Sequence, residues 1–235
     1  MKPPPELRQR IRLKVQSALS RVGEHLSLSQ ISSLNACINY LEVGRWLKAK
    51  GFRTRPRYAD REELYSAVAT RIRTERVLYL EFGVWQGSSM RSWSRLLQNP
   101  LTSLHGFDSF EGLPEAWDAR RPRGTFSRDG ALPTFEDTRV VLHKGWFNDT
   151  LPGFALPDHE RLVLNLDADL YSSTIFVLHT LAKAIRPGTL LIFDEFCDRL
   201  HEMKAFDEFL ETTRTHFHFL AGTENLEQVV FERVD

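Results

Sequence analysis

The sequence predicts an α/β fold with a doubly wound, mostly parallel seven-stranded sheet and an N-terminal helical extension. From Val77 onward, short apolar runs alternate with segments of helical periodicity, which is the pattern of successive βαβ units. The final two apolar runs are joined only by the short segment GTENLE, which leaves no room for a helical crossover, so the last strand is expected to be antiparallel. Before residue 76, by contrast, the apolar residues recur at helical spacing alone.

The helical extension is expected to contain three helices. Glu6–Arg21 predicts a basic helix, and the third helix is expected over about Asp60 to Arg73. Between them, Ser27 and Gln30 have the spacing of a capping box, which predicts the start of a helix that ends near Gly51. We therefore divide the chain into an N-terminal helical region, residues 1–75, and a main domain, residues 76–235.

The main domain is expected to contain seven strands and three intervening helices. The strands are predicted at Val77–Val84, Ser103–Asp108, Val140–Lys144, Leu162–Asp167, Thr189–Asp194, His216–Ala221 and Gln228–Arg233. The helices are predicted at about 88–98, 172–186 and 201–214.

Composition and cysteine usage are those of an ordinary globular protein. The 235 residues are 42% hydrophobic and 26% charged, which allows a sizeable core. No apolar stretch approaches the roughly 20 residues of a membrane span, so no membrane partner is expected. Cys37 and Cys197 lie far apart without metal-ligand spacing, so we expect reduced thiols and a cytoplasmic protein.

Charge is distributed unevenly although the net charge is zero. Residues 1–57 contain twelve Lys or Arg and three Glu, a balance of +9 that the remaining residues offset. A basic arm of this kind suits nucleic acid, an anionic substrate or a membrane surface. Few aromatic residues are available for stacking and no nucleic-acid motif is present, so we favour a solvated helical face that complements an acidic main domain.

Two pairs of carboxylates follow two of the predicted strands. Asp167 and Asp169 come after one buried run, and Asp194 and Glu195 come after the next. Adjacent parallel strands lie about 4.8 Å apart, so their carboxyl ends can bring these side chains to one place. Hard cations such as Mg²⁺ prefer oxygen ligands, and uncompensated carboxylates would repel one another. The pattern therefore predicts a divalent metal site at the edge of the sheet.

The first predicted strand leads into a glycine-containing turn, Glu81-Phe-Gly-Val-Trp-Gln-Gly-Ser-Ser. Gly83 and Gly87 before a helix N-terminus allow backbone amides to approach a ligand closely. No Gly-Lys-Ser/Thr follows, and the third glycine of a pyrophosphate fingerprint is missing, which argues against NAD. Asp108 ends the next strand, where an acidic residue can accept both ribose hydroxyls. The pattern indicates a nucleoside site.

Taken together, these segments resemble class I S-adenosylmethionine-dependent methyltransferases, and specifically the macrocin O-methyltransferase family. The resemblance covers about residues 77–235 and rests on the joint, ordered occurrence of EFGVWQGSS, GFDSFEGLPE, HKGWFNDTLP, LNLDADLYSST and PGTLLIFDEF. It implies the Rossmann-like methyltransferase sheet, S-adenosylmethionine as donor, and Mg²⁺ or another divalent cation that grips neighbouring hydroxyls of a sugar.

The resemblance also implies roles for individual residues. The cofactor would be bound by Glu81, Gly83, Gly87, Ser88, Asp108, Ser109 and Trp146, with Asp108 on the ribose and Trp146 against the adenine. The metal would be held by Asp167, Asp194 and Glu195. Catalysis would involve Asp169 as general base, next to Asp167. The Asp194-Glu195 pair departs from the more common Asp-Asp pair, which puts the position or preference of the metal in doubt.

The expected function is Mg²⁺-dependent O-methylation of a hydroxyl on a sugar or polyhydroxylated small molecule of the natural-product type. A catechol-like phenol is the nearest alternative acceptor, because vicinal hydroxyls of either kind chelate Mg²⁺. A nucleoside-binding module without catalysis is the alternative from another class. In relatives the N-terminal region forms a lid over the acceptor or a subunit interface, so a homodimer is an expectation drawn from the resemblance alone.

Overall fold

Residues 4–235 are described by the structure, a computed structural model. They divide into two units, one that ends at Leu41 and one that comprises Glu42–Asp235. The first unit contains α1 (Pro5–Gly23) and the beginning of α2 (Leu28–Ala49). Both helices were predicted. The capping box forms as expected: the Ser27 N–H donates to Gln30 Oε1 at 2.8 Å, and the Gln30 N–H donates to Ser27 Oγ at 3.3 Å. No side chain of α1 is buried, and its role as lid or interface stays a prediction.

The second unit is built on one sheet, which has eight strands within the described residues. Its order is β1-β7-β8-β6-β5-β2-β3-β4. Seven strands correspond to the predicted ones: β2 (Val77–Phe82), β3 (Ser103–Asp108), β4 (Val140–Lys144), β5 (Arg161–Leu166), β6 (Leu190–Phe193), β7 (Phe217–Thr223) and β8 (Val229–Arg233). The additional β1 (Arg57–Tyr58) pairs with β7 at the sheet edge and is too short for any periodic pattern to predict.

The last strand is antiparallel, as the short connection before it predicted. β8 lies between β6 and β7 and runs antiparallel to both, whereas all the other neighbouring strands are parallel. The sheet therefore has the mostly parallel, doubly wound form that the sequence predicted.

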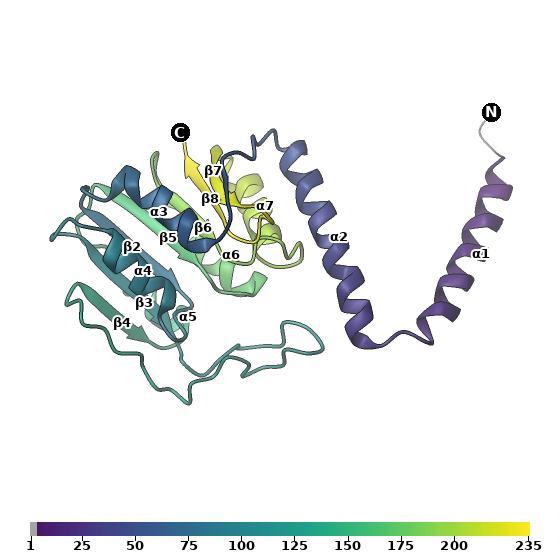
Figure 1. Ribbon diagram of the computed structural model, residues 1–235, viewed down its shortest axis with the longest axis horizontal. Helices are drawn as coiled ribbons and strands as arrows, with labels where there is room; N and C mark the ends of the chain where they lie inside the picture. The colour runs from purple at the N-terminus through teal and green to yellow at the C-terminus, as the bar shows by residue number, and fades with distance from the viewer. Residues whose placement is uncertain (1–3) are drawn as a thin grey trace. The chain divides into compact units, whose positions relative to one another are not determined.

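Helices cover both faces of this sheet (Figure 1). The packing follows from the alternation of side chains along a strand, because successive residues point to opposite faces. On β2, Val77 and Tyr79 pack with α3 (Arg61–Ile72) and α4 (Ser88–Leu96). Leu78, Leu80 and Phe82 pack in the other cluster, together with α6 (Tyr171–Thr180), α7 (Glu202–Thr213) and the end of α2. Burial on both faces explains why β2 reads as an apolar run that is interrupted only by Glu81.

Packing places the boundary between the two units earlier than the expected division at 75/76. Helix α3 buries Leu64, Tyr65 and Val68 in the same cluster as β2, and β1 is hydrogen-bonded to β7. Val43 and Trp46 of α2 also belong to the core of the sheet. Residues 42–75 are therefore part of the main unit, because their apolar side chains belong to the two clusters that cover the sheet.

The strands end in a continuous row at their carboxyl edge. The Asp167 N–H donates to the Phe82 carbonyl at 3.0 Å, and the Gly83 N–H donates to the Phe107 carbonyl at 3.0 Å. The Asp194 N–H extends the row by donating to the Leu166 carbonyl at 3.2 Å. The chain order reverses between β2 and β5, and such a switch point leaves a crevice at the carboxyl ends of the strands.

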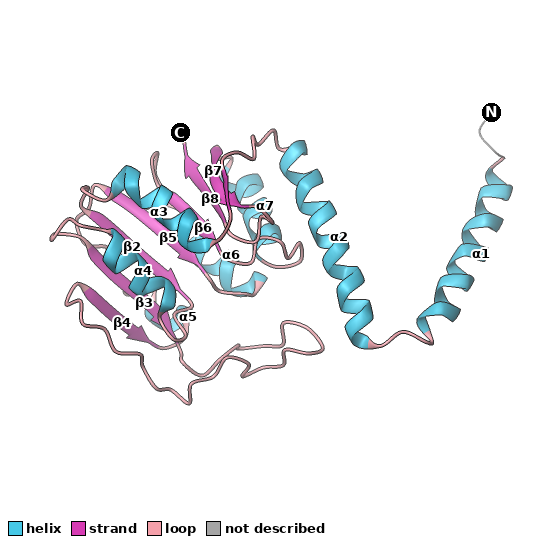
Figure 2. Ribbon diagram, in the orientation of Figure 1, coloured by secondary structure: helices cyan, strands magenta, loops and turns pink. Residues whose placement is uncertain are grey.

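The connection from β3 to β4 spans residues 109–139 and is a loop almost throughout (Figure 2). It is tied to the body of the domain: the Trp117 indole donates to Asp198 Oδ2 at 3.1 Å, and Lys144 Nζ of β4 donates to the Gly130 carbonyl at 2.8 Å. A second deviation from the predicted elements follows β4, where Phe147–Thr150 form the short helix α5.

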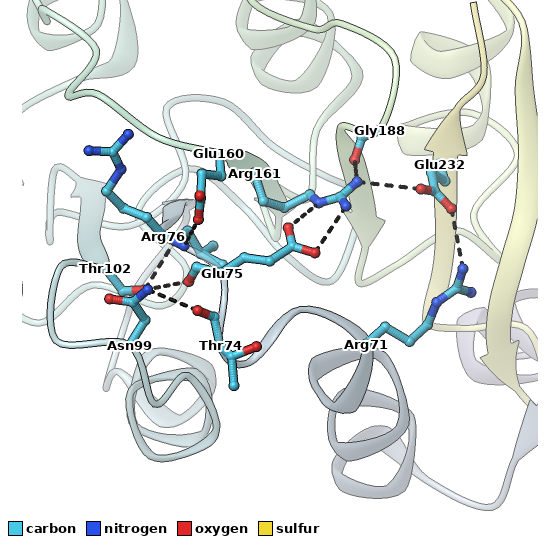
Figure 3. Close-up of polar contacts among 11 residues, drawn as sticks. Arg71, Thr74, Glu75, Arg76, Asn99, Thr102, Glu160, Arg161, Gly188 and Glu232 are labelled. Carbon is cyan, nitrogen blue, oxygen red and sulfur yellow. Dashed lines mark hydrogen bonds and ion pairs between the residues drawn. The ribbon is translucent and has the colours of Figure 1, made fainter.

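At the opposite, amino-terminal edge, a polar network joins the start of β5 to its surroundings (Figure 3). Arg161 donates to both carboxylate oxygens of Glu75, at 2.8 and 3.2 Å, and to the Gly188 carbonyl at 2.6 Å. Glu232 of β8 lies 3.5 Å from the same guanidinium and 3.7 Å from Arg71 of α3. One planar side chain thereby links the strand to three other segments.

We predict that Arg161→Met lowers the free energy of unfolding by about 1–3 kcal/mol, because Glu75 and the Gly188 carbonyl lose charge-assisted hydrogen bonds. Urea denaturation followed by circular dichroism measures the change. Arg95→Met is the matched control, since Arg95 is exposed and has no ion pair within the described residues, and it should change stability by no more than about 0.5 kcal/mol. Equal effects of the two substitutions would contradict a structural role for the network.

Candidate active site

A cavity of about 750 Å³ opens at the carboxyl edge of the sheet. Nine of the eleven sequence-predicted site residues line it: Gly83, Ser88, Asp108, Ser109, Trp146, Asp167, Asp169, Asp194 and Glu195. Two are not among the lining residues, Glu81 and Gly87, and both lie in the segment that builds the wall. The structure thus brings the predicted nucleoside residues and the predicted metal ligands to one cavity.

The turn after β2 requires glycine at position 83. Gly83 has φ +93°, and a Cβ placed on it would lie 1.8 Å from the Asp167 carbonyl oxygen. No side chain fits between these two backbones. The close approach brings the turn after β2 directly beside the first of the carboxylates that follow β5.

Asp108, at the end of β3, organises the same turn. Its Oδ2 accepts the N–H groups of Val84 and Trp85 at 2.9 and 2.8 Å, and its Oδ1 accepts the Phe110 N–H at 2.7 Å. The carboxylate therefore has a fixed orientation at the cavity wall. These bonds give Asp108 a structural role in addition to the ribose contact predicted from the sequence.

Helix α4 begins at this wall. Gly87 is its N-cap in the left-handed region, with φ +78°, and it makes no side-chain cap, so the first amides of the helix lack a side-chain acceptor. A Cβ at Gly87 would come within 2.5 Å of the Phe135 ring. Ser88 and Ser89 follow at the start of the helix and line the cavity. Such a helix start favours a negatively charged group.

Glu81 lies on β2, two residues before Gly83, and is 1% exposed. Burial raises the pKa of Glu81 from its ordinary 4.5 to about 8, against the opposing effect of the Tyr79 hydroxyl, which donates to Oε2 at 2.6 Å. The raised pKa favours the neutral form at pH 7. The structure shows a buried carboxyl group here, while its predicted contact with a cofactor stays a prediction.

Aromatic side chains form another part of the lining. Trp146 follows β4 as the N-cap of α5 and lines the cavity, while its contact with an adenine stays a prediction. Trp85 and Phe126 are 45% and 42% exposed, and their rings meet edge to face with centroids 6.0 Å apart. Phe126 belongs to the β3–β4 loop, and no sequence signal identified it as a site residue.

The carboxylates that follow β5 and β6 share a crowded environment. Burial raises the pKa of Asp167 well above its usual range, and the neighbouring Asp194 and Asp169 raise it further. Burial and Asp194 likewise raise the pKa of Glu195 to about 8. Glu202 of α7 adds a fully buried carboxyl whose Oε2 accepts the Glu195 N–H at 2.9 Å. Close acidic groups of this kind repel one another when they are ionised, and a positive charge nearby stabilises their ionised forms.

Asp169 has the properties of a functional side chain. Its φ of +60° is unusual for a residue other than glycine, and backbone strain of this kind clusters at functional sites. Burial, followed by the negative charge of Asp194, raises the pKa of Asp169 to about 7. A carboxylate with a pKa near neutrality is suited to accept a proton.

The structure adds one cation that sequence reasoning missed. Arg61, the first residue of α3, lines the cavity, where its Nη2 donates to Asp194 Oδ2 at 3.1 Å and its Nη1 donates to Ser89 Oγ at 3.3 Å. Asp194 itself is 3% exposed, and its Oδ1 has no hydrogen-bond partner among residues 4–235. Arg61 gave no signal in the sequence, because the first position of a helix is ordinarily solvated and position 61 is far from every motif.

The chemistry of the predicted metal ligands fits a hard cation. Asp167, Asp194 and Glu195 all present carboxylate oxygens to one cavity, and Asp194 Oδ1 is a buried oxygen without a partner. The ligand atoms of all three do not converge within 4.8 Å, so a shared cation requires rotation of side chains. The set that does converge this closely among residues 4–235 is Glu195, Cys197 and Glu227, whose thiol suits softer metals than Mg²⁺.

The strand order, with β8 antiparallel beside β6 and a cavity at the β2–β5 switch point, defines the Rossmann-like fold of class I methyltransferases. The O-methyltransferase NovP has this fold with a TM-score of 0.55 and 23% identity, over 74% of this chain and 78% of that one. The calicheamicin methyltransferase CalS11 matches with a TM-score of 0.55 and 18% identity, over 99% of this chain and 94% of that one.

The chain belongs to the macrocin-O-methyltransferase (TylF) family, whose family model matches residues 60–219. Among curated relatives, the 8-demethyl-8-(2,3-dimethoxy-alpha-L-rhamnosyl)-tetracenomycin-C 4'-O-methyltransferase of Streptomyces olivaceus is 32% identical over 154 residues, which cover 53% of this chain and 57% of that protein. The mycinamicin III 3''-O-methyltransferase of Micromonospora griseorubida is 28% identical over 170 residues, which cover 57% and 65%. The chain thus spans less than two thirds of the length of each relative.

Within residues 4–235, no helix is both long enough and apolar enough to cross a membrane.

We predict that Gly83→Ala destabilises the protein by about 3 kcal/mol or more, because the new methyl group overlaps the Asp167 backbone. Gly124→Ala is the matched control: Gly124 has a similar φ of +83°, but a Cβ there meets nothing within 4 Å. The control should cost only the left-handed strain, about 1–2 kcal/mol. Urea denaturation compares the two variants, and equal losses would show that the close approach is not a constraint.

We predict that the unfolding free energy of Glu81→Gln depends less on pH than that of the wild type. A carboxyl whose folded pKa is raised contributes its full stability below the unfolded value of 4.5 and loses it as pH rises through about 8. Between pH 6 and 8 the variant should therefore gain about 1 kcal/mol per pH unit relative to the wild type. Denaturation curves at four pH values give this difference, and a constant difference would mean that Glu81 is already ionised.

Proposed function

We propose that this protein is an O-methyltransferase that transfers the methyl group of S-adenosylmethionine to a hydroxyl of a sugar or polyhydroxylated small molecule with the help of a divalent cation such as Mg²⁺. One observation carries the proposal: a single cavity at the switch point is lined both by the glycine turn after β2 and by the carboxylates after β5 and β6. Membership of the macrocin-O-methyltransferase family supports the reaction class.

The donor wall of the cavity suits an adenosine with an amino-acid side chain. Asp108 is oriented toward the site by three backbone amides and would accept the ribose hydroxyls. Trp146 offers apolar area for the adenine, and Ser88 opens α4 where a charged end of the ligand would lie. When bound, S-adenosylmethionine supplies an activated sulfonium methyl, and the surrounding carboxylates favour that positive charge.

The acceptor wall presents the predicted metal ligands. Asp167, Asp194 and Glu195 would hold a divalent cation, which when bound supplies an electrophile that orients neighbouring hydroxyls and favours their deprotonation. Its charge would also relieve the mutual repulsion that raises the pKa of Asp167.

Asp169 would act as the general base. It lines the same cavity, and its strained backbone directs it from the turn that joins β5 to α6. The carboxylate accepts the proton of the acceptor hydroxyl while the oxygen bonds to the methyl carbon and the bond from sulfur to that carbon breaks. The products are the methyl ether, the uncharged thioether of the donor and protonated Asp169, which returns its proton to solvent.

The acceptor itself is proposed as a molecule with vicinal hydroxyls and an apolar part. The names of the relatives describe methylation on natural products, one of them a rhamnosylated tetracenomycin. The exposed Trp85 and Phe126 favour an apolar surface next to the reacting group. A catechol shares the vicinal hydroxyls and therefore belongs in the same acceptor panel.

We predict that Asp169→Asn binds S-adenosylmethionine with unchanged affinity but turns over at least about a hundredfold more slowly, since it removes the base and leaves the donor wall intact. Calorimetry measures donor binding, and formation of S-adenosylhomocysteine measures turnover with glycosides and catechols as acceptors. Asp108→Asn is the complementary variant and should weaken donor binding.

Each part of the proposal has its own contrary outcome in this experiment. Full turnover in Asp169→Asn would contradict the role of Asp169 as the base. Wild-type turnover that survives a chelator would contradict the requirement for a divalent cation. Failure of the wild type to bind S-adenosylmethionine would contradict both the assignment of the donor and the proposed function.

A further inference from the structure

Arg61 stands between the two halves of the cavity. Its guanidinium contacts Ser89, at the start of α4 on the donor wall, and Asp194, in the carboxylate cluster. The side chain is 35% exposed, so part of it faces the open cavity rather than the protein interior. A guanidinium has five N–H donors, and two of them account for these contacts, which leaves donors for a ligand.

Acidic side chains outnumber basic ones around the cavity, although burial raises the pKa of Asp167, Asp169 and Glu195. Five carboxylates line it, Asp108, Asp167, Asp169, Asp194 and Glu195, against two cationic side chains, Arg61 and Arg123. An anionic group that enters such a site is repelled unless a cation stands beside it. Arg123 belongs to the β3–β4 loop, whereas Arg61 is the cation that contacts the start of α4.

The donor that we propose carries an anionic group of this kind. The amino-acid part of S-adenosylmethionine ends in a carboxylate. The ribose of the donor would lie at Asp108, on the neighbouring part of the cavity wall. The start of α4 suits the carboxylate because Gly87 makes no side-chain cap, so the first amides of the helix have no side-chain acceptor. A guanidinium binds a carboxylate with two parallel hydrogen bonds, and Arg61 lies within reach of Ser89 at that point.

We propose that Arg61 binds the carboxylate of the amino-acid part of the donor, a role that rests on the proposed function. Its bond to Asp194 holds the guanidinium in place and screens the donor carboxylate from the acidic cluster. Arg61 thereby acts as a donor-specificity residue: it separates a nucleoside that carries an amino acid from one that does not.

The test compares two adenosine thioethers that differ only in this part. S-Adenosylhomocysteine has the amino-acid carboxylate, and 5′-methylthioadenosine lacks it while keeping the adenine, the ribose and the sulfur. Calorimetry measures the affinity of each for the full-length wild type and for Arg61→Gln, Arg61→Lys, Arg123→Gln and Asp194→Asn. A chelator in every sample excludes contributions from divalent cations.

We predict that Arg61→Gln weakens S-adenosylhomocysteine binding by about tenfold to a hundredfold and leaves 5′-methylthioadenosine binding within about twofold. Arg61→Lys should recover part of the loss, because it restores the charge without the planar pair of donors. Arg123→Gln should keep the wild-type preference for S-adenosylhomocysteine. Asp194→Asn should keep it as well, since the guanidinium remains and a repulsive charge is gone.

Several results would overturn the inference. Equal weakening of both ligands in Arg61→Gln would indicate a structural role, and loss of the preference in Arg123→Gln would assign the carboxylate to the other cation. Loss of the preference in Asp194→Asn would attribute the effect to the acidic cluster. A wild type that binds both ligands equally well overturns the role of Arg61 but leaves the proposed function standing, whereas a wild type that binds neither removes both.

Discussion

The close approach of two backbones at the switch point is the constraint on which the site depends. Gly83 and the Asp167 carbonyl lie so near that no side chain fits at position 83. The adjacent hydrogen bond from Asp167 to the Phe82 carbonyl keeps β2 and β5 paired up to this point. Because the strands stay paired to their ends, the glycine turn and the first carboxylate open into the same cavity. Without this approach the glycine turn and the carboxylates that follow β5 would lie on separate surfaces.

The burial of acidic groups is the second constraint, and it follows from the first. Carboxylates that end neighbouring strands are necessarily close, and burial raises the pKa of Asp169 to about 7 and that of Glu195 to about 8. Proteins ordinarily neutralise or pair such groups, and Arg61 pairs with Asp194. A cluster with this surplus of acidic groups favours cationic ligands and disfavours anionic ones. The proposed donor has both charges, which is why the position of a single arginine acquires a role in recognition.

Much of the candidate site could be predicted because its residues occupy strand ends. A buried strand has a visible apolar run, and the first polar residue after the run lies at the sheet edge, as Asp108, Asp167 and Asp194 do. Arg61 and Phe126 could not be found in this way. Arg61 starts a helix that was assigned to the N-terminal region, and Phe126 lies within a long loop whose path no local pattern specifies. Glu202 could not be predicted either, because a glutamate at the start of a helix is usually exposed and the sequence does not show that this one is buried.

The sequence by itself determined the alternation of elements, the antiparallel final strand and the identity of the carboxylates, because each depends on local periodicity, connection length or residue type. Only the tertiary structure decided the partners of these groups. The pairing of Arg61 with Asp194, the aromatic contact of Trp85 with Phe126, and the inclusion of α3 in the main unit all join segments far apart in the chain. Such contacts depend on how the helices pack on the two faces of the sheet. This packing cannot be predicted from any single stretch of neighbouring residues.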